Sequence, residues 1–516
     1  MSNVASLHTP TSTKLRFALR LIAALVGGSL AYLVFPRLGI WPLMFVMVGL
    51  IYVSARGLRF WRSVTVGLIA GFTFFASQTF WLSMYLGPEP LIALSLLQAI
   101  IFACFFASSS ALVTKLARHF SGVGLAIISA AVSAIFWVAR EWFSGNYPYG
   151  GFPWARLVSS QTETPISRLV WLGGMPLADF FIVFAVVLGI ELLIIKPSLR
   201  NGLLASASLI GLAVLPMTLP LSAKAEDGNL KIASAQGNAN AGLFSNRESG
   251  RIFMNHIRAT NQLLETGQRF DVLVWPENAV DLDLFGNPNN FRELENLVNR
   301  INRPLIFGTV TQRDKLYNTS VLWLPKKGMT DWYDKTKPVP FAEYVPDRAF
   351  WGAIAPDLIG LLSYDFAPGS RDGLFEVKGK KLGTLICFEI AVDDVPRNLV
   401  NGGAEVILSQ TNNSDFGRSD EAYQQLAIAK LRAIETGRSL VNISTVGPSA
   451  VYLADGTQAS ELKAFTRGFM NTEVPLRTSK TPAMFIVEPF TWFVTLTALA
   501  LTLYLAISNL LPRRRK

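Results

Sequence analysis

The sequence predicts a membrane protein with about eight membrane-spanning helices and one large α/β domain inserted before the last span. Of its 516 residues, 51% are hydrophobic and only 16% are charged. The mean hydropathy is +0.35, which is high for a water-soluble protein. The apolar excess lies in residues 1–221 and 483–511, whereas residues 225–473 have the composition of a globular domain. These observations predict two kinds of structure in one chain.

Eight apolar runs are the basis of the predicted spans. A helix needs ~20 apolar residues to cross the hydrocarbon core of a bilayer, and most of the runs approach or exceed that length. The runs are 17–35, 40–55, 64–86, 91–114, 122–138, 169–195, 202–221 and 483–511. The second and the fifth are short. The first is followed at once by further runs and lacks a clear small-residue cleavage site, so we interpret it as a retained span and not as a signal peptide.

The basic residues predict how the spans are oriented. Lysine and arginine gather in the loops on the N-terminal side, at 56–62, 115–118 and 196–200, and in the tail 512–516. The opposite loops carry few basic residues, except the loop after the fifth run. Because basic loops stay in the cytoplasm, we expect a cytoplasmic N-terminus, a basic cytoplasmic tail and an α/β domain on the outer side of the cytoplasmic membrane.

The loop that breaks the charge pattern has an unusual composition. Residues 141–154 are rich in tryptophan, tyrosine, phenylalanine, glycine and proline. An aromatic belt at the membrane interface has this composition, and so does a re-entrant lid over a substrate. Composition alone leaves both interpretations open.

Residues 225–473 alternate between short β-rich runs and amphipathic helical stretches. The expected strands are 230–235, 272–275, 305–310, 320–324, 382–387, 406–410 and 440–444. The expected helices are 251–265, 291–301 and 421–436. This alternation is typical of a layered α/β or α+β domain of about 250 residues.

Three motifs that we interpret as strand ends carry reactive side chains. Glu277 follows the strand at 272–275, Lys335 lies in the motif YDK, and Cys387 ends the strand at 382–387. A carboxylate, a cation and a thiol at strand ends can meet in one pocket, as general base, oxyanion stabiliser and nucleophile. We also expect Lys335 to lower the pKa of the thiol.

Each of these residues also has an ordinary interpretation when it is taken alone. Glu277 could cap a helix, Lys335 could be a solvated surface lysine, and Cys387 could be a small core residue. The second cysteine, Cys104, lies in an apolar run, so no disulfide is expected. With 3 histidines and no clustered thiols, we expect no metal site, and we expect no cofactor and no nucleic-acid partner.

The motifs WPE, YDK and ICFE, in this order and about 50 to 60 residues apart, resemble the Glu–Lys–Cys triad of the nitrilase superfamily. The segment PVPFAEYVP and the flanking spans narrow the resemblance to the apolipoprotein N-acyltransferase family. It implies an αββα sandwich in which Glu277 is the base, Lys335 the oxyanion stabiliser and Cys387 the nucleophile. Glu343 would orient Lys335 or relay protons, and the backbone N–H of Phe388 would complete the oxyanion hole.

The resemblance leaves Glu389 either a functional or a supporting carboxylate. Asp415 stands where many members of the family have a tryptophan, which puts lipid and lipoprotein preference in doubt but not the triad. Segments 341–344 and 347–362 are candidate lids. The implied substrates are a phospholipid acyl donor and a diacylated apolipoprotein, which react through a Cys387 thioester in a ping-pong cycle.

Two other functions stay open on the sequence. One is a membrane-tethered amidase that acts on a small molecule, although eight spans exceed what an anchor needs. The other is a non-catalytic transporter or scaffold with an inert domain, which the presence of all three triad residues disfavours. We expect the chain to be a monomer in the lipid bilayer.

Overall fold

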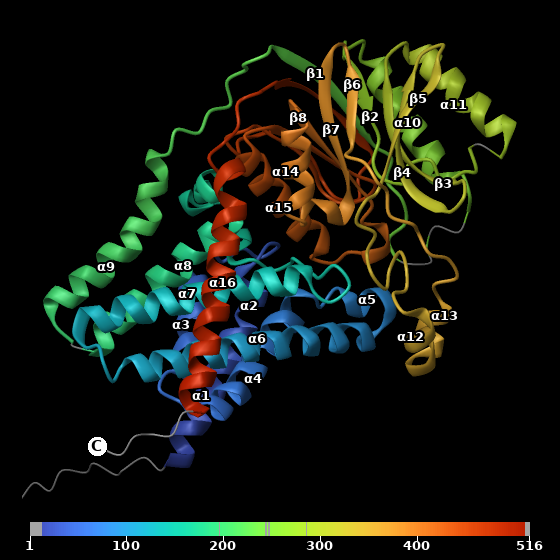
Figure 1. Ribbon diagram of the computed structural model, residues 1–516. Helices are drawn as coiled ribbons and strands as arrows, with labels where there is room; N and C mark the ends of the chain where they lie inside the picture. The colour runs from blue at the N-terminus through green and yellow to red at the C-terminus, as the bar shows by residue number, and fades with distance from the viewer. Residues whose placement is uncertain (1–12, 196, 243–244, 246–247, 285, 511–516) are drawn as a thin grey trace, which may run out of the picture.

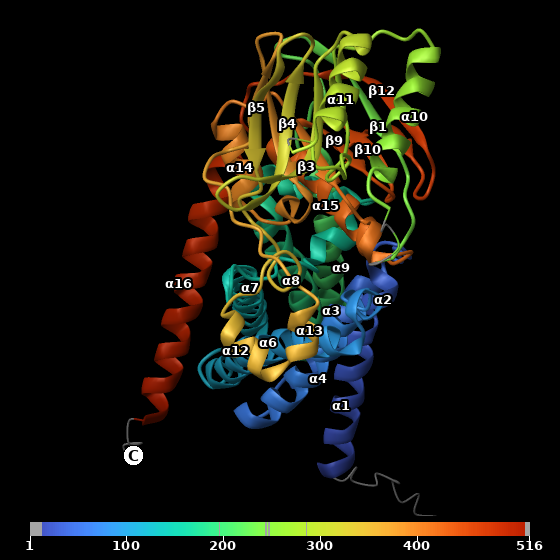
Figure 2. The same ribbon diagram turned by 90° about the vertical axis from the view of Figure 1, so that its right-hand side faces the viewer.

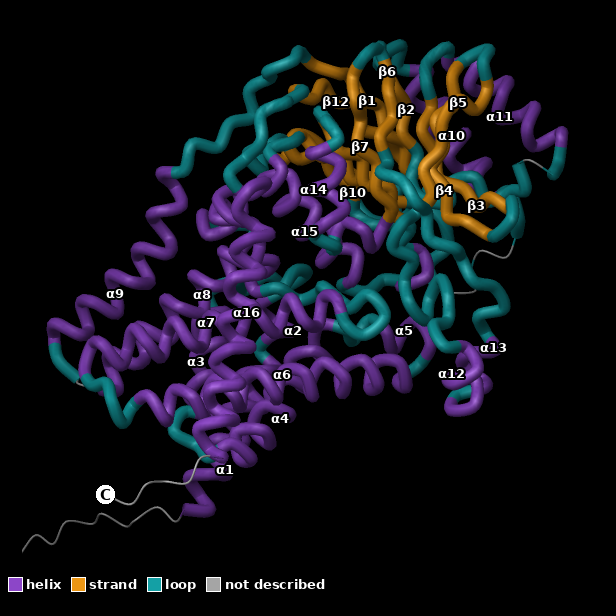
Figure 3. The backbone as a smooth tube through the Cα atoms, viewed as in Figure 1, coloured by secondary structure: helices purple, strands orange, loops and turns teal. Residues whose placement is uncertain are grey.

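The structure, a computed structural model, describes residues 13–195, 197–242, 245, 248–284 and 286–510. It consists of a bundle of helices and a domain of two β-sheets, which lie at opposite ends of the molecule (Figure 1). Strands are confined to the second part, as the tube in Figure 3 makes clear. The basic tail at 512–516 lies outside the described residues.

The helical bundle is formed by the two ends of the chain. Its α-helices are α1 Thr13–Ser29, α2 Ala31–Val34, α3 Leu43–Ala55, α4 Phe60–Gln78, α5 Leu82–Leu86, α6 Pro88–Leu116, α7 Gly122–Asn146, α8 Val170–Ile195, α9 Leu199–Val214 and α16 Ala483–Leu510. Three 3₁₀ helices join them: η1 Leu157–Gln161, η2 Pro165–Leu169 and η3 Leu215–Thr218. Each of the eight predicted apolar runs corresponds to a helix of this bundle.

Among the described residues, seven helical segments are long and apolar enough to cross a membrane. The eighth apolar helix, α3, has 13 residues and therefore rises only about 20 Å, less than the ~30 Å of a hydrocarbon core. By their length and composition, these helices indicate a multi-pass membrane protein.

The fifth predicted span was too short. It was expected to end at residue 138, but α7 continues through Arg140 and Glu141 to Asn146. These two charged residues are buried inside the bundle, where Arg140 donates a hydrogen bond to Glu141 across 3.3 Å. A hydropathy pattern ends at charged residues, whereas the helix continues because the bundle pairs them.

The second part of the chain contains two six-stranded mixed sheets. The first has the order β12-β1-β2-β3-β4-β5 and the second the order β11-β10-β9-β8-β7-β6. The strands are β1 Asn229–Gln236, β2 Val272–Val274, β3 Leu305–Gln312, β4 Leu316–Leu324, β5 Gly328–Asp334, β6 Leu374–Val377, β7 Lys380–Ile386, β8 Val406–Thr411, β9 Ser439–Ser444, β10 Ser449–Tyr452, β11 Gln458–Leu462 and β12 Gly468–Pro475.

The two sheets face each other and carry helices on their outer faces (Figure 2). The helices of this domain are α10 Arg251–Glu265, α11 Pro288–Ile301, α12 Arg348–Ile354, α13 Pro356–Gly360, α14 Asp394–Asn401 and α15 Glu421–Thr436, with two 3₁₀ helices, η4 Cys387–Ile390 and η5 Ser414–Phe416. α10 and α11 cover the first sheet, and α14 and α15 cover the second. The result is an αββα sandwich.

The two-residue period of the strands builds these layers. In β2, Val272 and Val274 point into the core between the sheets, while Leu273 packs under α10 and α11. In β7, Leu382 and Ile386 enter the same inter-sheet core, and Leu385 faces α14 and α15. Because both faces of these central strands are covered, their buried positions are mostly apolar, with Thr384 a buried polar exception in β7.

Five strands were not predicted: β5, β6, β10, β11 and β12. Four of these are the edges of the two sheets. An edge strand is covered less completely, so its sequence can be polar, and β11 reads QASEL with no fully buried residue. The bounds of α10 and α15 agree with the prediction. α10 is amphipathic, with one face on the first sheet, whereas most residues of α15 are buried.

Candidate active site

Cys387 occupies a sharp turn at the end of a buried strand. β7 ends at Ile386, and the chain continues directly into the single-turn helix η4. Cys387 has φ +52°, in the left-handed region that non-glycine residues rarely adopt. Strained backbone of this kind is concentrated at functional sites. The turn takes the thiol out of the sheet at the end of β7.

The structure brings the three predicted triad residues together. The Lys335 ammonium lies 3.6 Å from Glu277 Oε1, and the charges of both Glu277 and Lys335 act on the pKa of the Cys387 thiol. Glu277 follows β2 after two residues, and Lys335 directly follows β5. Both side chains are buried, with 6% and 2% of their surfaces exposed. Three strand ends therefore hold a carboxylate, an ammonium and a thiol in one pocket.

Burial decides the protonation of the thiol. It raises the pKa of Cys387 well above its usual value, and the negative charge of Glu277 adds to this, whereas Lys335 lowers it. As expected, Lys335 lowers the pKa of the thiol, but burial and the charge of Glu277 raise it by more. At rest, Cys387 is therefore a thiol beside a carboxylate, and it would need to lose its proton before it could act as a nucleophile.

The protonation states of Glu277 and Lys335 suit such a proton transfer. Burial raises the pKa of Glu277, and Glu343 raises it further, against the opposing effect of Lys335. Burial lowers the pKa of Lys335, but the carboxylates of Glu343 and Glu277 more than compensate and raise it above its usual value. Lys335 therefore stays a cation, and Glu277 becomes a stronger base than an exposed carboxylate.

Glu343 is a direct partner of the predicted oxyanion stabiliser. Its Oε2 lies 2.8 Å from Lys335 Nζ and also accepts a hydrogen bond of 2.7 Å from the backbone N–H of Val339. Asn318, in β4, donates from Nδ2 to both Glu277 Oε1 at 2.7 Å and Glu343 Oε1 at 2.9 Å. Asn318 was not predicted, since it lies in an ordinary strand pattern without a motif of its own.

Glu389 accepts hydrogen bonds from backbone N–H groups and from two hydroxyls around the site. Its Oε1 accepts hydrogen bonds from the Tyr333 hydroxyl and from the backbone and hydroxyl of Thr336, at 2.7–2.8 Å, and from the Lys337 backbone at 3.2 Å. Its Oε2 accepts from the Ile386 backbone at 2.8 Å. This fully buried carboxylate ties the segment that contains Lys335 to the turn that contains Cys387.

A polar network behind the thiol was also not predicted. Gln425, on α15, places Nε2 3.5 Å from Cys387 Sγ. Asn413 Nδ2 fixes the orientation of that amide through a hydrogen bond of 2.8 Å to Gln425 Oε1, and it donates equally to Glu421 Oε2. Burial raises the pKa of Glu421 to about 8, so this carboxyl is mostly neutral at pH 7 and adds little repulsion to a thiolate.

The membrane part of the chain packs against Phe388, the residue after Cys387. The Phe388 ring lies nearly parallel to Phe152 and Trp154, at centroid distances of 6.2 and 6.4 Å. Trp154 Nε1 also donates to Gln424 Oε1 at 2.6 Å. Next to this contact, Arg156 forms two hydrogen bonds of 2.7 Å to the Asp393 carboxylate. The end of the aromatic segment 141–154 is thus a packing surface for the turn at Cys387.

The candidate lids extend from the α/β domain toward the helical bundle. α12 and α13 form a small projection beside the bundle (Figures 1 and 2). Phe350 and Ile354 on α12 are exposed. At the base of the projection, the Tyr149 hydroxyl of the membrane part donates to Asp347 Oδ2 at 2.8 Å. Among the described residues, no group of three or more histidine, cysteine, aspartate and glutamate residues could hold a metal ion.

An αββα sandwich with a glutamate, a lysine and a cysteine at its strand ends is the architecture of a carbon–nitrogen hydrolase domain. The carbon-nitrogen hydrolase family profile matches residues 231–481, and the profile of the apolipoprotein N-acyltransferase N-terminal domain matches residues 27–188. The chain belongs to the apolipoprotein N-acyltransferase family. It is an acyltransferase of the nitrilase superfamily, as its motifs indicated.

Relatives with that name match most of the chain. An apolipoprotein N-acyltransferase of Mycolicibacterium smegmatis is 28% identical over 505 residues, covering 90% of this chain and 81% of the relative. One from Pseudomonas putida is 28% identical over 482 residues, covering 89% and 92%. A solved nitrilase-superfamily amidase from Nesterenkonia matches with a TM-score of 0.39 and 15% identity, covering 53% of this chain and 99% of the amidase.

Proposed function

We propose that the protein transfers a fatty acyl chain from a membrane phospholipid to the α-amino group of the N-terminal diacylglyceryl-cysteine of an apolipoprotein. The observation that carries the proposal is the buried cluster of Glu277, Lys335 and Cys387, whose catalytic turn packs directly on the membrane part through Phe388. A thiol in this position can reach lipid esters near the membrane surface.

In the first half-reaction, Cys387 takes the acyl chain. Glu277 accepts the thiol proton while Sγ attacks the ester carbonyl carbon, and the oxyanion that forms is stabilised by Lys335 and the backbone N–H of Phe388. The intermediate collapses with cleavage of the bond to the glycerol oxygen. That oxygen takes the proton from Glu277, and a lysophospholipid leaves the Cys387 thioester behind.

In the second half-reaction, the lipoprotein amine replaces the thiol. An α-amine in water ordinarily has a pKa of about 8, so a useful fraction of it is neutral near pH 7. The amine nitrogen attacks the thioester carbonyl and gives a proton to Glu277. Cleavage of the carbon–sulfur bond yields the amide, and the proton returns to Cys387 Sγ.

The position in the cell follows from the same proposal. The basic loops at 56–62 and 115–118 favour a cytoplasmic N-terminus. We propose that the short α3 crosses the membrane together with the six longer N-terminal helices, so that residues 225–473 would lie on the outer side of the cytoplasmic membrane, where lipoproteins are exposed. We further propose that a monomer is sufficient, since each group used above comes from one chain.

A membrane-tethered amidase is the competing function, and a non-catalytic scaffold is the third. The contacts of Phe152 and Trp154 with Phe388 disfavour the first, because a mere anchor has no reason to form part of the catalytic turn. The buried Lys335 and Glu277 disfavour the second, since uncompensated burial of such a pair is costly and a scaffold gains nothing from it.

Intact-protein mass spectrometry after incubation with phospholipid tests the proposal. The wild-type protein should gain one fatty-acyl mass that hydroxylamine removes, and Cys387→Ala should gain none. A diacylated lipopeptide should discharge the adduct and become a triacylated amide. If no adduct forms while a small amide is hydrolysed, the acyltransferase proposal fails and the amidase takes its place. If Cys387→Ala supports lipoprotein maturation like wild type, the catalytic role of Cys387 is refuted.

A further inference from the structure

A chain of ion pairs joins the membrane part to the turn at Cys387. On the membrane side it begins at Arg156, which directly precedes η1. The start of η1 is fixed to α8, because Asp179 accepts hydrogen bonds from the backbone N–H groups of Leu157 at 3.2 Å and Val158 at 2.7 Å. Asp179 is fully buried. The Arg156 guanidinium therefore extends from a backbone that a spanning helix holds in place.

Asp393, which lies between η4 and α14, accepts hydrogen bonds from two guanidinium groups. Arg156 donates to both of its carboxylate oxygens at 2.7 Å, which is the strong two-bond geometry of an arginine and a carboxylate. Arg432, on α15, donates to Oδ1 at 2.7 Å. Burial acts to raise the pKa of Asp393, but the two arginines more than offset this and hold it below its usual value. Asp393 is thus an anion shared by a cation of the membrane part and a cation of the α/β domain.

Arg432 continues this chain of contacts to the turn itself. Its side chain is fully buried, and it donates from Nε to the Ile390 carbonyl and from Nη2 to the Ala391 carbonyl, both at 2.9 Å. Ile390 is the last residue of η4, and Cys387 is the first. The last carbonyls of a helix have no partner within the helix. Arg432 therefore supplies the donors that hold this end of the turn.

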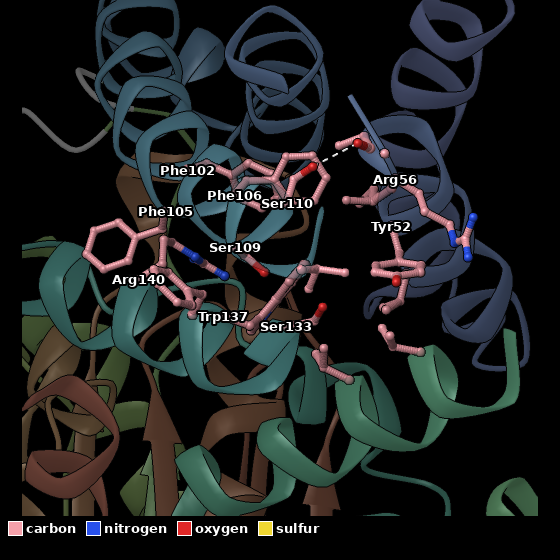
Figure 4. Close-up of a pocket in the computed structure, with 18 residues that line it drawn as sticks. Tyr52, Arg56, Phe102, Phe105, Phe106, Ser109, Ser110, Ser133, Trp137 and Arg140 are labelled. Carbon is pink, nitrogen blue, oxygen red and sulfur yellow. Dashed lines mark hydrogen bonds between the residues drawn. The ribbon is translucent and has the colours of Figure 1, made fainter. Parts of the chain in front are cut away.

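Other charged groups of the bundle find their partners within the bundle. Figure 4 shows two of them, Arg56 and Arg140, on either side of a pocket between the helices. Arg56 donates to Glu191 on α8 at 3.0 Å, and Arg140 donates to Glu141 on α7 at 3.3 Å. Arg156 differs from both, because its carboxylate partner lies next to η4.

We propose that Arg156 and Arg432 are positioning residues for the acyl transfer, linked through Asp393. Together they fix the end of η4 relative to the membrane part, and they thereby place Cys387 Sγ and the Phe388 N–H. This role rests on the proposed function, because it concerns the same reaction. A misplacement of about 1 Å can cost about a hundredfold in rate, so loss of the link should slow thioester formation without weakening lipid binding.

Arg156→Gln tests the link, and Lys430→Gln is the matched control. Lys430 lies on α15, as Arg432 does, and donates to Glu163 Oε1 of the membrane part at 2.8 Å. The control therefore loses an ion pair of nearly the same length between the same two parts of the protein, but one that contains no residue of η4.

Two measurements are made on each full-length variant. The first is the time course of Cys387 acylation by phospholipid, followed by intact-protein mass spectrometry, which gives kcat and KM of the half-reaction. The second is hydrogen–deuterium exchange of the backbone amides, which needs no substrate and so does not depend on the proposed function.

Arg156→Gln should lower kcat of acylation by about tenfold or more, leave KM unchanged, and speed up amide exchange in the peptides that cover η4. Lys430→Gln should behave like wild type. The double variant Arg156→Gln/Asp393→Asn should lose no more than Arg156→Gln alone, because both substitutions break the same link.

Wild-type kcat and wild-type exchange of η4 in Arg156→Gln overturn the inference. So do an equal loss in Lys430→Gln, a rise in KM with kcat unchanged, and faster exchange throughout the domain, which indicates general destabilisation. If the wild type forms no thioester, the proposed function fails, and the exchange of η4 alone decides whether the link exists. If Arg156→Gln does not fold, Arg156→Lys decides: it keeps the charge but loses the two-bond geometry, so a smaller loss with locally faster exchange supports the link, and wild-type values overturn it.

Discussion

Substitution of Glu343 by glutamine tests how the charges of the site set the base. Glu277 must be ionised to accept the thiol proton, so kcat/KM should rise with pH through the pKa of Glu277. Burial raises that pKa, and the charge of Glu343 raises it further. Glu343→Gln removes the second contribution and also frees Lys335 to pair with Glu277. Both changes lower the pKa, so the acidic limb should move to lower pH.

The size of the shift follows from Asn318. It donates to an oxygen of each carboxylate, at 2.7 and 2.9 Å, so these two oxygens are at most about 5.6 Å apart. Two unit charges at that distance repel by about 3 kcal/mol at an effective dielectric constant of 20, which corresponds to about 2 pKa units. Because Lys335 lies between them and screens the repulsion, we expect a shift of about 1 to 2 units.

The assay is the pH dependence of kcat/KM for transfer from a fluorescent phospholipid to a diacylated lipopeptide. Glu343→Gln should also lower kcat, since Lys335 is drawn toward Glu277 and away from the oxyanion. Glu376→Gln is the control, because this carboxylate is exposed on β6 and should leave the profile in place. An acidic limb that stays fixed, or moves to higher pH, would refute this account of the electrostatics.

Two further predictions concern the residues that position the catalytic turn. Glu389→Gln leaves at least one of the five donors to this carboxylate unpaired, which costs about 1–3 kcal/mol of folding free energy. The thermal unfolding temperature and kcat should therefore both fall, and unchanged values would contradict a positioning role for Glu389. Gln425→Leu removes the N–H donor at Cys387 Sγ, worth about 1 kcal/mol, so the pH profile of thiol alkylation should move upward by up to ~1 unit. Gln424→Leu, which loses the contact with Trp154 instead, should leave that profile unshifted.

The positions of the triad residues could be predicted because each sequence motif lies at the end of a strand. Glu277 and Cys387 each follow a strand whose residues are buried on both faces, and such strands have unmistakably apolar sequences. The end of a buried strand fixes where its next residue points. The edge strand β5 was not recognised, yet Lys335 was still placed correctly at a strand end, because its motif YDK carried the resemblance.

The supporting residues could not be predicted from one sequence. Asn318 lies in the middle of β4, and Gln425 lies in the buried face of α15, and neither position breaks its local pattern. Their importance arises only from contacts with residues about 40 positions away, Glu277 and Cys387. Arg140 was assigned to a loop for a related reason: local hydropathy cannot show that a charge is buried inside a bundle.

The contact between the membrane part and the catalytic turn explains why so many spans belong to one enzyme. Cys387 is held in a left-handed conformation that is unfavourable by itself, so its neighbours must fix it. On one side Glu389 ties the turn to the Lys335 segment, and on the other Phe388 packs on Phe152 and Trp154. The membrane part is thus a wall of the site, and it sets the position of the thiol relative to the bilayer. Because a shift of about 1 Å in a reacting group can cost about a hundredfold in rate, a rigid bundle of many helices suits this enzyme better than one flexible anchor.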